Sequence, residues 1–497
     1  MIINKIKYFS ILSLTALFIV SCETEDYTFP VEEAPALDAG SANFSTYVSV
    51  GNSLTAGFTD GALFIAGQEN SMPNLLAQKF AMIGGGDFSQ PLTNDNVGGL
   101  LLGGTMIQEP RLIFTGSDIV RLDATPTNEI GSPIPGPYNN MGVPGAKSFH
   151  LLANGYGNVA GVPTGQANPY FVRMASNPNA SVLEDAASQG ASFITLWIGA
   201  NDVLSYSLAG GAGVDQTGNP DSSTYGSTDI TDPTLFAGVY STLLSTLTGN
   251  GAQGVVLNIP DVTSIPYFTT IPYNPVPLDA ATADQLNQAY DAYNQGMLQA
   301  EAVGFISTEE REARTITFAE GQNAVVIIDE YLTDLTAFGA PSIRQVTPDD
   351  LIVLPAKSFI GTLVNNDPTL INGVTVPLDD NWVLTTNEQT EVSNATMAYN
   401  QTIEQLATQN GLAFVDANSL MQQVVNGGLM FDEFNMTGQL VFGNTFSLDG
   451  VHPTARGYAF IANEILKAID ATYGSNFQAS GMLYKADDFT TMYSPGL

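Results

Sequence analysis

The chain has 497 residues, with 49 Asp and Glu against 14 Lys and Arg, which gives a formal net charge of −35. This charge argues against nucleic acid or an anionic membrane surface as a partner, because both repel an acidic protein. Hydrophobic residues make up 44% of the chain and include 26 Phe and 19 Tyr, enough for a large packed core. The composition therefore indicates a folded globular protein with an acidic exterior.

The first 21 residues have the pattern of an export signal. Lys5 and Lys7 precede an apolar run from Tyr8 to Val20 that is too short for a membrane-spanning helix. The run leads into Cys22, the only cysteine, so no disulfide within the chain accounts for it. Small residues before a cysteine resemble the lipobox of bacterial lipoproteins. We predict a signal peptide over 1–21, lipid on Cys22 and anchoring in the outer membrane of a Gram-negative bacterium; an uncleaved membrane anchor is the alternative.

Residues 22–42 are predicted to be a flexible acidic tether between the lipid and the domain. They combine several carboxylates with Pro30 and Pro35, a composition that favours an extended linker. Acidic residues directly after a lipidated cysteine also resemble the signals that send some Gram-negative lipoproteins to the outer cell surface. We therefore expect the domain to be exposed there.

An α/β domain is predicted over 43–475, followed by a C-terminal tail over 476–497. Apolar, β-branched runs predict strands buried on both faces at 44–50, 192–198, 254–259 and 412–416. Amphipathic helices are predicted between and after them, at 286–302, 392–407 and 455–471. This alternation is typical of a parallel sheet flanked by helices.

Three long connections exceed what a minimal sheet needs, at about 58–140, 205–233 and 340–390. They are rich in Gly, Asn, Asp and Pro, and loops of this length are usually lids, binding surfaces or small subdomains. We expect substrate selectivity to reside there. The run 215–221 has oxygen ligands at spacings that suit Ca²⁺ but lacks the order of an EF-hand loop, so we interpret it as a solvated loop.

Two separated segments predict a serine nucleophile and its base. Asp449 precedes His452 by three residues across a tight turn, and a catalytic histidine needs an acceptor at its far ring nitrogen. Ser53 lies where a predicted strand runs into a loop bounded by Gly51 and Gly57. We predict Ser53 as nucleophile, His452 as base and Asp449 as its orienting group. The other histidine, His150, is interpreted as a packing or surface residue.

Acyl transfer also requires donors for the oxyanion. Asn201 follows a buried strand within Gly199-Ala200-Asn201-Asp202, and this turn can direct its side-chain amide into a cleft. Backbone donors are expected from Ser53 and from a glycine within 140–146, of which Gly145 is preferred. Asp202 is expected to brace the turn.

Four blocks, Gly51-Asn52-Ser53-Leu54, Gly145, Gly199-Ala200-Asn201-Asp202 and Asp449-Gly450-Val451-His452-Pro453, occur in the order found in the SGNH/GDSL hydrolase family. The chain resembles this family from about residue 45 to 473. The resemblance implies a flavodoxin-like three-layer α/β/α fold with long insertions and no metal or other cofactor. It implies an oxyanion hole made by Ser53, Gly145 and Asn201, with His452 as base and Asp449 orienting it.

One departure from the family pattern is Asn52, which stands where an Asp usually precedes the serine. Asn keeps the shape of Asp and can still hydrogen-bond the loop, so we expect the loop geometry to survive.

These patterns predict a serine esterase that hydrolyses carboxylic esters through an acyl-enzyme on Ser53. Two alternatives remain open: an acyltransferase in which a sugar or lipid hydroxyl replaces water, and a non-catalytic surface-binding lipoprotein of the same fold. Acetyl esters of glycans and acyl esters of lipids are both candidate substrates. The sequence predicts neither the acyl chain length nor the oligomeric state.

Overall fold

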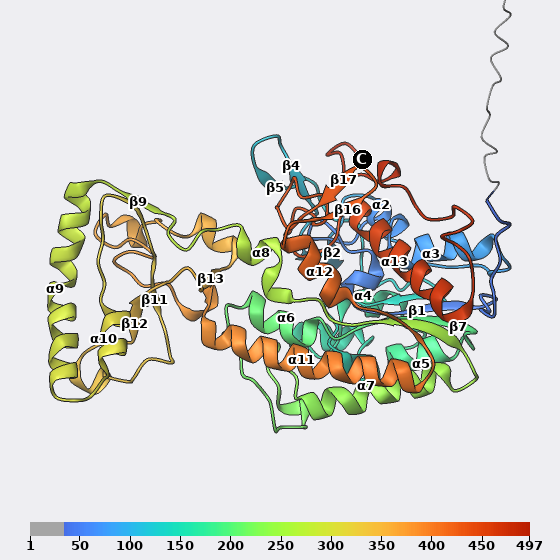
Figure 1. The fold of residues 1–497 in the computed structure, drawn as a ribbon, viewed down its shortest axis with the longest axis horizontal. Coiled ribbons are helices and arrows are strands. Elements are labelled where there is room, and N and C mark those ends of the chain that lie inside the picture. The colour runs from blue at the N-terminus through green and yellow to red at the C-terminus, as the bar shows by residue number, and fades with distance from the viewer. Residues whose placement is uncertain (1–33) are drawn as a thin grey trace, which may run out of the picture. The chain divides into compact units, whose positions relative to one another are not determined.

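A five-stranded parallel sheet lies at the centre of the computed structural model, which describes residues 34–497 (Figure 1). Its strands lie in the order β6-β1-β7-β8-β15. Their bounds are β1 (Tyr47–Gly51), β6 (Asn140–Gly142), β7 (Phe193–Trp197), β8 (Gln253–Leu257) and β15 (Ala413–Val415). Numbered along the chain, this order is 2-1-3-4-5, so the direction of winding reverses at β1. Ligands of such sheets bind beyond the carboxyl ends of the strands at this reversal.

Helices cover both faces of the sheet. Val48, Ile194 and Val256 pack with the first helical layer, which consists of α5 (Val182–Ala187), α7 (Pro233–Thr248) and α11 (Thr386–Gln409). Tyr47 and Phe193 point to the other face and pack with α3 (Met72–Ala81) and α13 (Ala455–Tyr473). The predicted parallel sheet flanked by helices is therefore confirmed. Four of its strands match predicted runs, whereas β6 was not predicted as a strand.

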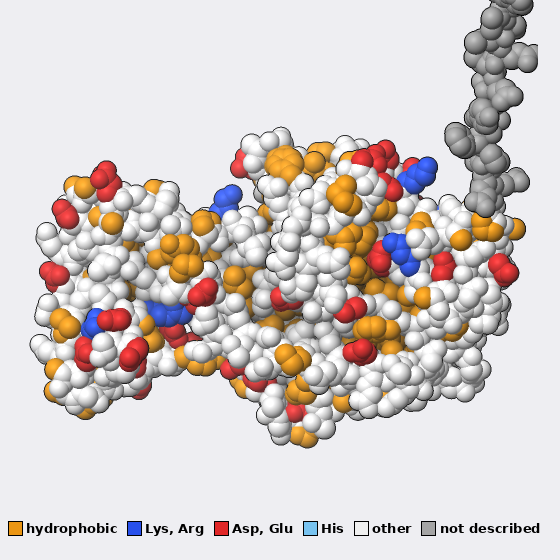
Figure 2. Space-filling view, in the orientation of Figure 1, with side chains coloured by type: hydrophobic (Ala, Val, Ile, Leu, Met, Phe, Trp, Pro, Cys, Tyr) orange, Lys and Arg blue, Asp and Glu red, His pale blue; other side chains and the backbone are white. Residues whose placement is uncertain are grey.

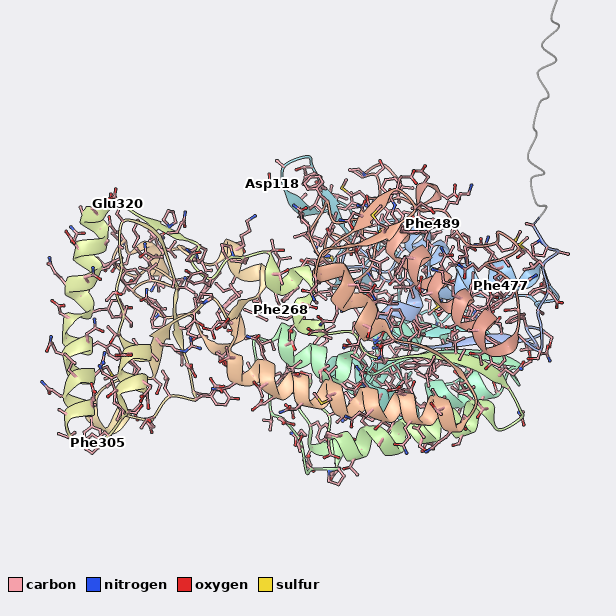
Figure 3. All side chains as sticks on the ribbon, in the orientation of Figure 1. Asp118, Phe268, Phe305, Glu320, Phe477 and Phe489 are labelled. Atoms are coloured by element: carbon pink, nitrogen blue, oxygen red, sulfur yellow. The ribbon has the colours of Figure 1, made fainter. Side chains whose placement is uncertain are left out.

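Both ends of the described chain pack on this domain. Ser41 donates its backbone N–H to Tyr473 (2.8 Å), and Asp38 donates to the Asn476 side chain (2.7 Å). Phe477 and Phe489 are buried in the core that contains α13 (Figure 3). The prediction of a flexible tether is thus wrong for residues 36–42, because apolar side chains among them find partners on the domain. The predicted tail over 476–497 is likewise part of the packed structure.

The predicted insertion at 58–140 is interrupted by a helix of the sheet layers, α3. The rest of this region comprises α2 (Ile65–Glu69) and two hairpins, β2 (Leu100–Leu102) with β3 (Thr105–Gln108) and β4 (Leu112–Phe114) with β5 (Ile119–Arg121). The short helix α1 (Ser53–Ala56) lies just before the region. Outside this region lie α4 (Pro169–Met174), α6 (Asn201–Leu208), α8 (Pro266–Thr269), α12 (Ala417–Val425) and the hairpin β16 (Leu429–Phe431) with β17 (Phe434–Met436).

A larger insertion than predicted separates β8 from β15, and we call residues 276–384 the insertion lobe. It contains β9 (Val276–Leu278) paired with β10 (Gly321–Asn323), α9 (Ala280–Ala302), α10 (Thr308–Arg314), β11 (Val326–Ile328) paired with β12 (Ile343–Gln345), and β13 (Leu351–Ile352) paired with β14 (Val383–Leu384). The predicted insertion, 340–390, covers only the second part of this lobe.

The predicted helix at 286–302 exists as part of α9, but it packs on the lobe and not on the sheet (Figure 1). Asn287 donates to the Phe318 carbonyl (2.9 Å) and Tyr290 to that of Val374 (2.7 Å). An apolar stripe predicts that one helix face is covered, without identifying the segment that covers it.

Two further predictions concern the acidic exterior and the attachment of the chain to a membrane. Acidic side chains are distributed over the face in Figure 2 and are not gathered in one patch. Within residues 34–497, no helix is both long and apolar enough to cross a membrane. The predicted signal peptide and Cys22 lie outside the described residues.

Candidate active site

Ser53 is the first residue of α1, directly beyond the carboxyl end of β1. Asn52 caps this helix, and its side-chain oxygen accepts a hydrogen bond from the Leu54 N–H (3.0 Å). The expectation that Asn52 can hydrogen-bond the loop is therefore confirmed. Gly51 allows the loop to pack closely, since a Cβ there would lie 2.3 Å from the Trp197 carbonyl oxygen. This arrangement places Ser53 at the point where the winding of the sheet reverses.

Asp449 and His452 form a hydrogen-bonded pair in the loop before α13. Asp449 Oδ2 lies 2.8 Å from His452 Nδ1 and also accepts from the Gly61 N–H (2.9 Å). Asp449 Oδ1 accepts from the backbone N–H groups of Val451 and His452, both at 2.9 Å. Because an ionised carboxylate only accepts, Nδ1 must carry the ring proton, which leaves Nε2 of the neutral ring free to accept a proton.

The electrostatic environment keeps Asp449 ionised. Burial alone would raise the pKa of this carboxyl, but the charge of His452 and the hydrogen bonds from His452 and Val451 outweigh burial and lower it to about 2. The carboxylate is thus available to orient His452 over the whole neutral and mildly acidic range.

Asn201 is the first residue of α6, beyond the carboxyl end of β7. One N–H of its side-chain amide donates to the Ala146 carbonyl (2.9 Å), which fixes the amide and leaves a second N–H for a ligand. Asp202 is fully buried and accepts from the backbone and hydroxyl of Ser148 (2.8 and 2.7 Å). Asp202 therefore ties the Asn201 turn to the segment that follows Gly145.

Gly145 lies in the turn after β6 with φ +81°, a left-handed conformation that favours glycine. It lines an open cavity of about 450 Å³ together with Ser53, Asn201, Asp449 and His452. The structure thus brings all five predicted residues of the catalytic and oxyanion sites to one cavity. Among the hydrogen bonds of residues 34–497, none joins the Ser53 hydroxyl to His452; in ligand-free enzymes such contacts are often long.

Ser53, Asn201 and His452 also line a second cavity, of about 110 Å³, whose walls are almost wholly apolar. Its side chains come from β7, β8, α6, α12 and α13, and include Trp197, Leu204, Leu257, Leu420, Met421, Val424, Phe460 and Ile461. The open cavity on the other side has a mixed lining that includes Gln108, Asn168, Tyr170, Ser205 and Tyr267. Ser53, Asn201 and His452, which line both cavities together with Leu204 and Val451, therefore stand where a narrow apolar cavity meets a wider, more polar one.

The other histidine lies outside both cavities. His150 Nδ1 accepts from the Lys147 N–H (3.0 Å), and its ring stacks on Tyr156 with centroids 4.9 Å apart. Burial, and then the nearby Lys147 charge, lowers the pKa of His150 to about 4. These contacts agree with a packing role.

Sequence reasoning missed a group of residues that holds Asp449. The Ser447 hydroxyl donates to Asp449 Oδ1 (3.0 Å) and accepts from the Asp60 N–H (3.0 Å). Asp60 Oδ1 in turn accepts from the Leu448 N–H (3.0 Å). Burial, with a smaller contribution from the Asp449 charge, raises the pKa of Asp60 to about 7. Only the Asp-Gly turn at 60–61 is visible in the sequence, and nothing there points to residue 449.

Comparison of the sequence with known proteins assigns no function to this site, so its function is argued from its geometry. No family model matches the chain, and no curated protein does. The arrangement combines a hydroxyl at a helix N-terminus, an imidazole oriented by a carboxylate, and amide donors beside both. These are the groups that nucleophilic acyl transfer requires.

Proposed function

We propose that the protein is a serine esterase of the SGNH/GDSL type, which hydrolyses carboxylic esters through an acyl-enzyme on Ser53. The observation that carries this proposal is the 2.8 Å contact between Asp449 and His452 Nδ1 at the cavity that Ser53 lines. The strand order 2-1-3-4-5, with helices on both faces, supports a flavodoxin-like fold.

In the proposed reaction, Ser53 Oγ attacks the ester carbonyl while His452 Nε2 accepts the serine proton. Asp449 stays ionised and stabilises the imidazolium that forms. The developing oxyanion accepts hydrogen bonds from the Asn201 amide and from the backbone N–H groups of Ser53 and Gly145. His452 then returns the proton to the leaving alcohol, and water releases the acyl group by the same steps in reverse.

The apolar cavity favours a hydrocarbon acyl group over acetyl. Its volume is about 110 Å³, and an apolar protein cavity of about 150 Å³ holds one benzene molecule, so we expect room for roughly four to six carbons. The acyl chain would occupy this cavity, since burying a CH₂ group is worth about 0.8 kcal/mol. The alcohol part would lie in the open cavity, where the exposed Gln108 side chain offers polar contacts.

Hydrolysis of p-nitrophenyl esters from acetate to decanoate tests the proposal. We expect kcat/KM to peak at butyrate to hexanoate, and Ser53→Ala to lose nearly all turnover. Ser205→Ala is the matched control, because Ser205 lines the same open cavity but forms no hydrogen bond with Asp449 or His452. Normal turnover by Ser53→Ala would refute the assignment, whereas an acetate optimum would refute only the acyl cavity.

An acyltransferase is the second candidate, supported by the size of the open cavity, which at about 450 Å³ has room for an acceptor alcohol. Hydrolase and acyltransferase activity are distinguished by adding glycerol or a sugar and measuring the ratio of the new ester to the free acid. A product dominated by transfer at millimolar acceptor favours the transferase.

We also propose that the protein is exported and anchored by lipid on Cys22, on the strength of the apolar run Tyr8 to Val20 that precedes it. Mass spectrometry of the mature protein is expected to find a di- or triacylated N-terminal Cys22, and Cys22→Ser to release the protein from membranes. Mature protein that retains the segment from Lys5 to Val20 would contradict this.

A further inference from the structure

Three carboxylates from separate segments meet at the edge of the insertion lobe. Glu330 follows β11, Asp380 begins a short 3-10 helix (Asp380–Trp382), and Glu388 lies in the first turn of α11. Each offers an oxygen that lies within 4.8 Å of the oxygens offered by the other two. Glu330 is exposed, Asp380 is partly buried and Glu388 is buried, so the group runs from solvent into the protein.

No basic side chain within residues 34–497 compensates these three charges through an ion pair. Among the described residues, no Lys or Arg forms an ion pair with Glu330, Asp380 or Glu388. Arg344, which lies in the same lobe, is bound by Asp329 and Asp350, both at 2.6 Å. Three carboxylates this close together repel one another unless a cation or protons lie between them.

Glu388 adds an observation that points to a ligand. Its side chain is fully buried, and Oε2 accepts from the Thr385 N–H (2.5 Å) while Oε1 has no hydrogen-bond partner. The backbone of Gly211 lies against this carboxylate, since a Cβ there would come within 2.2 Å of Glu388 Cδ. A buried carboxylate oxygen without a donor is costly, and neighbouring carboxylates cannot donate to it while they are ionised. A positive ion between them removes the cost.

We propose that Glu330, Asp380 and Glu388 bind Ca²⁺. Carboxylate oxygens are the ligands that hard divalent cations prefer, and Ca²⁺ accepts mono- or bidentate carboxylates in flexible geometry with water completing the shell. The exposed Glu330 provides the entry path. The proposal is independent of the esterase proposal, because none of the three residues lines either cavity at Ser53.

The cation would act on stability by joining three segments. It would link the insertion lobe to the start of α11, a helix that continues onto the sheet and contacts α6 and α7. Gly210, two residues after α6, also lies against this region, since a Cβ there would be 2.5 Å from the Asp380 carbonyl. The site would therefore join the insertion lobe to the start of α11 and to the segment after α6, the helix that begins at Asn201.

The test uses the whole mature chain, stripped of metal with a chelator and titrated with CaCl₂ at pH 8 in a calorimeter. We expect one site per chain. At a Ca²⁺ concentration 100-fold above Kd, the Tm should rise by about 3 °C, since binding to the folded state alone stabilises it. Asp380→Asn and Glu330→Gln should each weaken binding at least tenfold. Glu320→Gln, an exposed carboxylate of the same lobe beside α9 (Figure 3), should change nothing.

The competing outcome is a cluster that holds protons. In that case metal-free wild type shows neither Ca²⁺-dependent heat nor a Tm shift at millimolar Ca²⁺, and the proposal is overturned. Binding that persists unchanged in Glu330→Gln and Asp380→Asn also overturns it. Glu330 is exposed, so its variant is expected to fold, which its Tm in chelator verifies. Ser53→Ala protein should bind Ca²⁺ as wild type does.

Discussion

Asp449→Asn is the substitution for which the structure makes the sharpest prediction. Oδ1 of Asp449 accepts three hydrogen bonds, from Val451, His452 and Ser447, so the amide oxygen of Asn must occupy that position. The amide nitrogen then takes the place of Oδ2, facing His452 Nδ1 and the Gly61 N–H. Because an amide nitrogen donates, Nδ1 must become the acceptor and the ring proton must move to Nε2. His452 then cannot accept the serine proton.

The expected loss of kcat/KM is about 10⁴-fold, the effect of the same change in a serine protease whose histidine takes the wrong tautomer. Stability should fall as well. The pKa of Asp449 is lowered from 3.8 to about 2, which at 1.36 kcal/mol per pKa unit corresponds to roughly 2 kcal/mol. Because the pKa is lowered on folding, wild type has this stability above about pH 4 and loses it as the pH falls towards 2.

The assay measures kcat/KM on a p-nitrophenyl ester and Tm at pH 7 for both proteins. Asp232→Asn is the control, because Asp232 lines neither cavity and accepts from the Leu235 and Gly218 N–H groups, both at 2.7 Å, through different oxygens, of which an amide can replace only one. It should lose stability without losing turnover. If Asp449→Asn keeps more than a tenth of wild-type kcat/KM at unchanged KM, the tautomer argument is refuted.

Four further outcomes are expected. Asn201→Ala should lower kcat by about 10²–10³ with a small change in KM, and a fall in Tm with kcat intact would make Asn201 a structural residue only. His452→Gln should lose nearly all ester turnover because its side chain cannot accept the serine proton, and turnover within tenfold of wild type would contradict the role of His452 as base. Burial raises the pKa of Asp60 from 3.8 to about 7, so the wild-type protein should lose up to about 4 kcal/mol of stability as the pH rises from 4 through 7. Asp60→Asn should remove that loss, and a variant with the same dependence of Tm on pH as wild type would contradict this role of Asp60. Ala417→Phe, which fills the apolar cavity from α12, should shift the ester optimum to acetate, whereas the exposed Gln423→Phe on the same helix should not; identical chain-length profiles would exclude that cavity as the acyl site.

The parts of the fold that could be predicted are those whose signal is local. Strands buried on both faces read as continuous apolar runs, which is why four strands of the sheet correspond to predicted segments. β6 could not be predicted from the sequence because it has only three residues, Asn140 to Gly142, and two of them, Asn and Gly, disfavour strands. It is nevertheless fully buried and pairs with β1, so tertiary packing overrides its propensity.

The candidate site likewise has one part that the sequence predicts and one part that it does not. Asp449 and His452 could be paired from the sequence because they lie three residues apart and contact each other across one turn. The apolar cavity could not be predicted, since Trp197, Leu257 and Phe460 reach it from different elements. Each of these side chains alone reads as ordinary core. Only the folded arrangement shows that they leave a space beside Ser53.

The acidic residues show most clearly why environment, and not residue type, assigns a role. Asp449, Asp60 and Glu388 look alike among the 49 acidic residues of the chain. Asp449 receives hydrogen bonds from its own turn, which hold its charge and let it orient a histidine. Asp60 meets its donor, the Leu448 N–H, across 388 positions of sequence, and its second oxygen has no partner, so burial raises its pKa. Glu388 faces the carboxylates of Glu330, from the insertion lobe, and of Asp380, just before α11, an arrangement for which we propose a cation. The same carboxyl group is thus held charged by donors of its own turn in Asp449, which a local pattern can indicate, whereas the environments of Asp60 and Glu388 depend on segments that only the fold brings together.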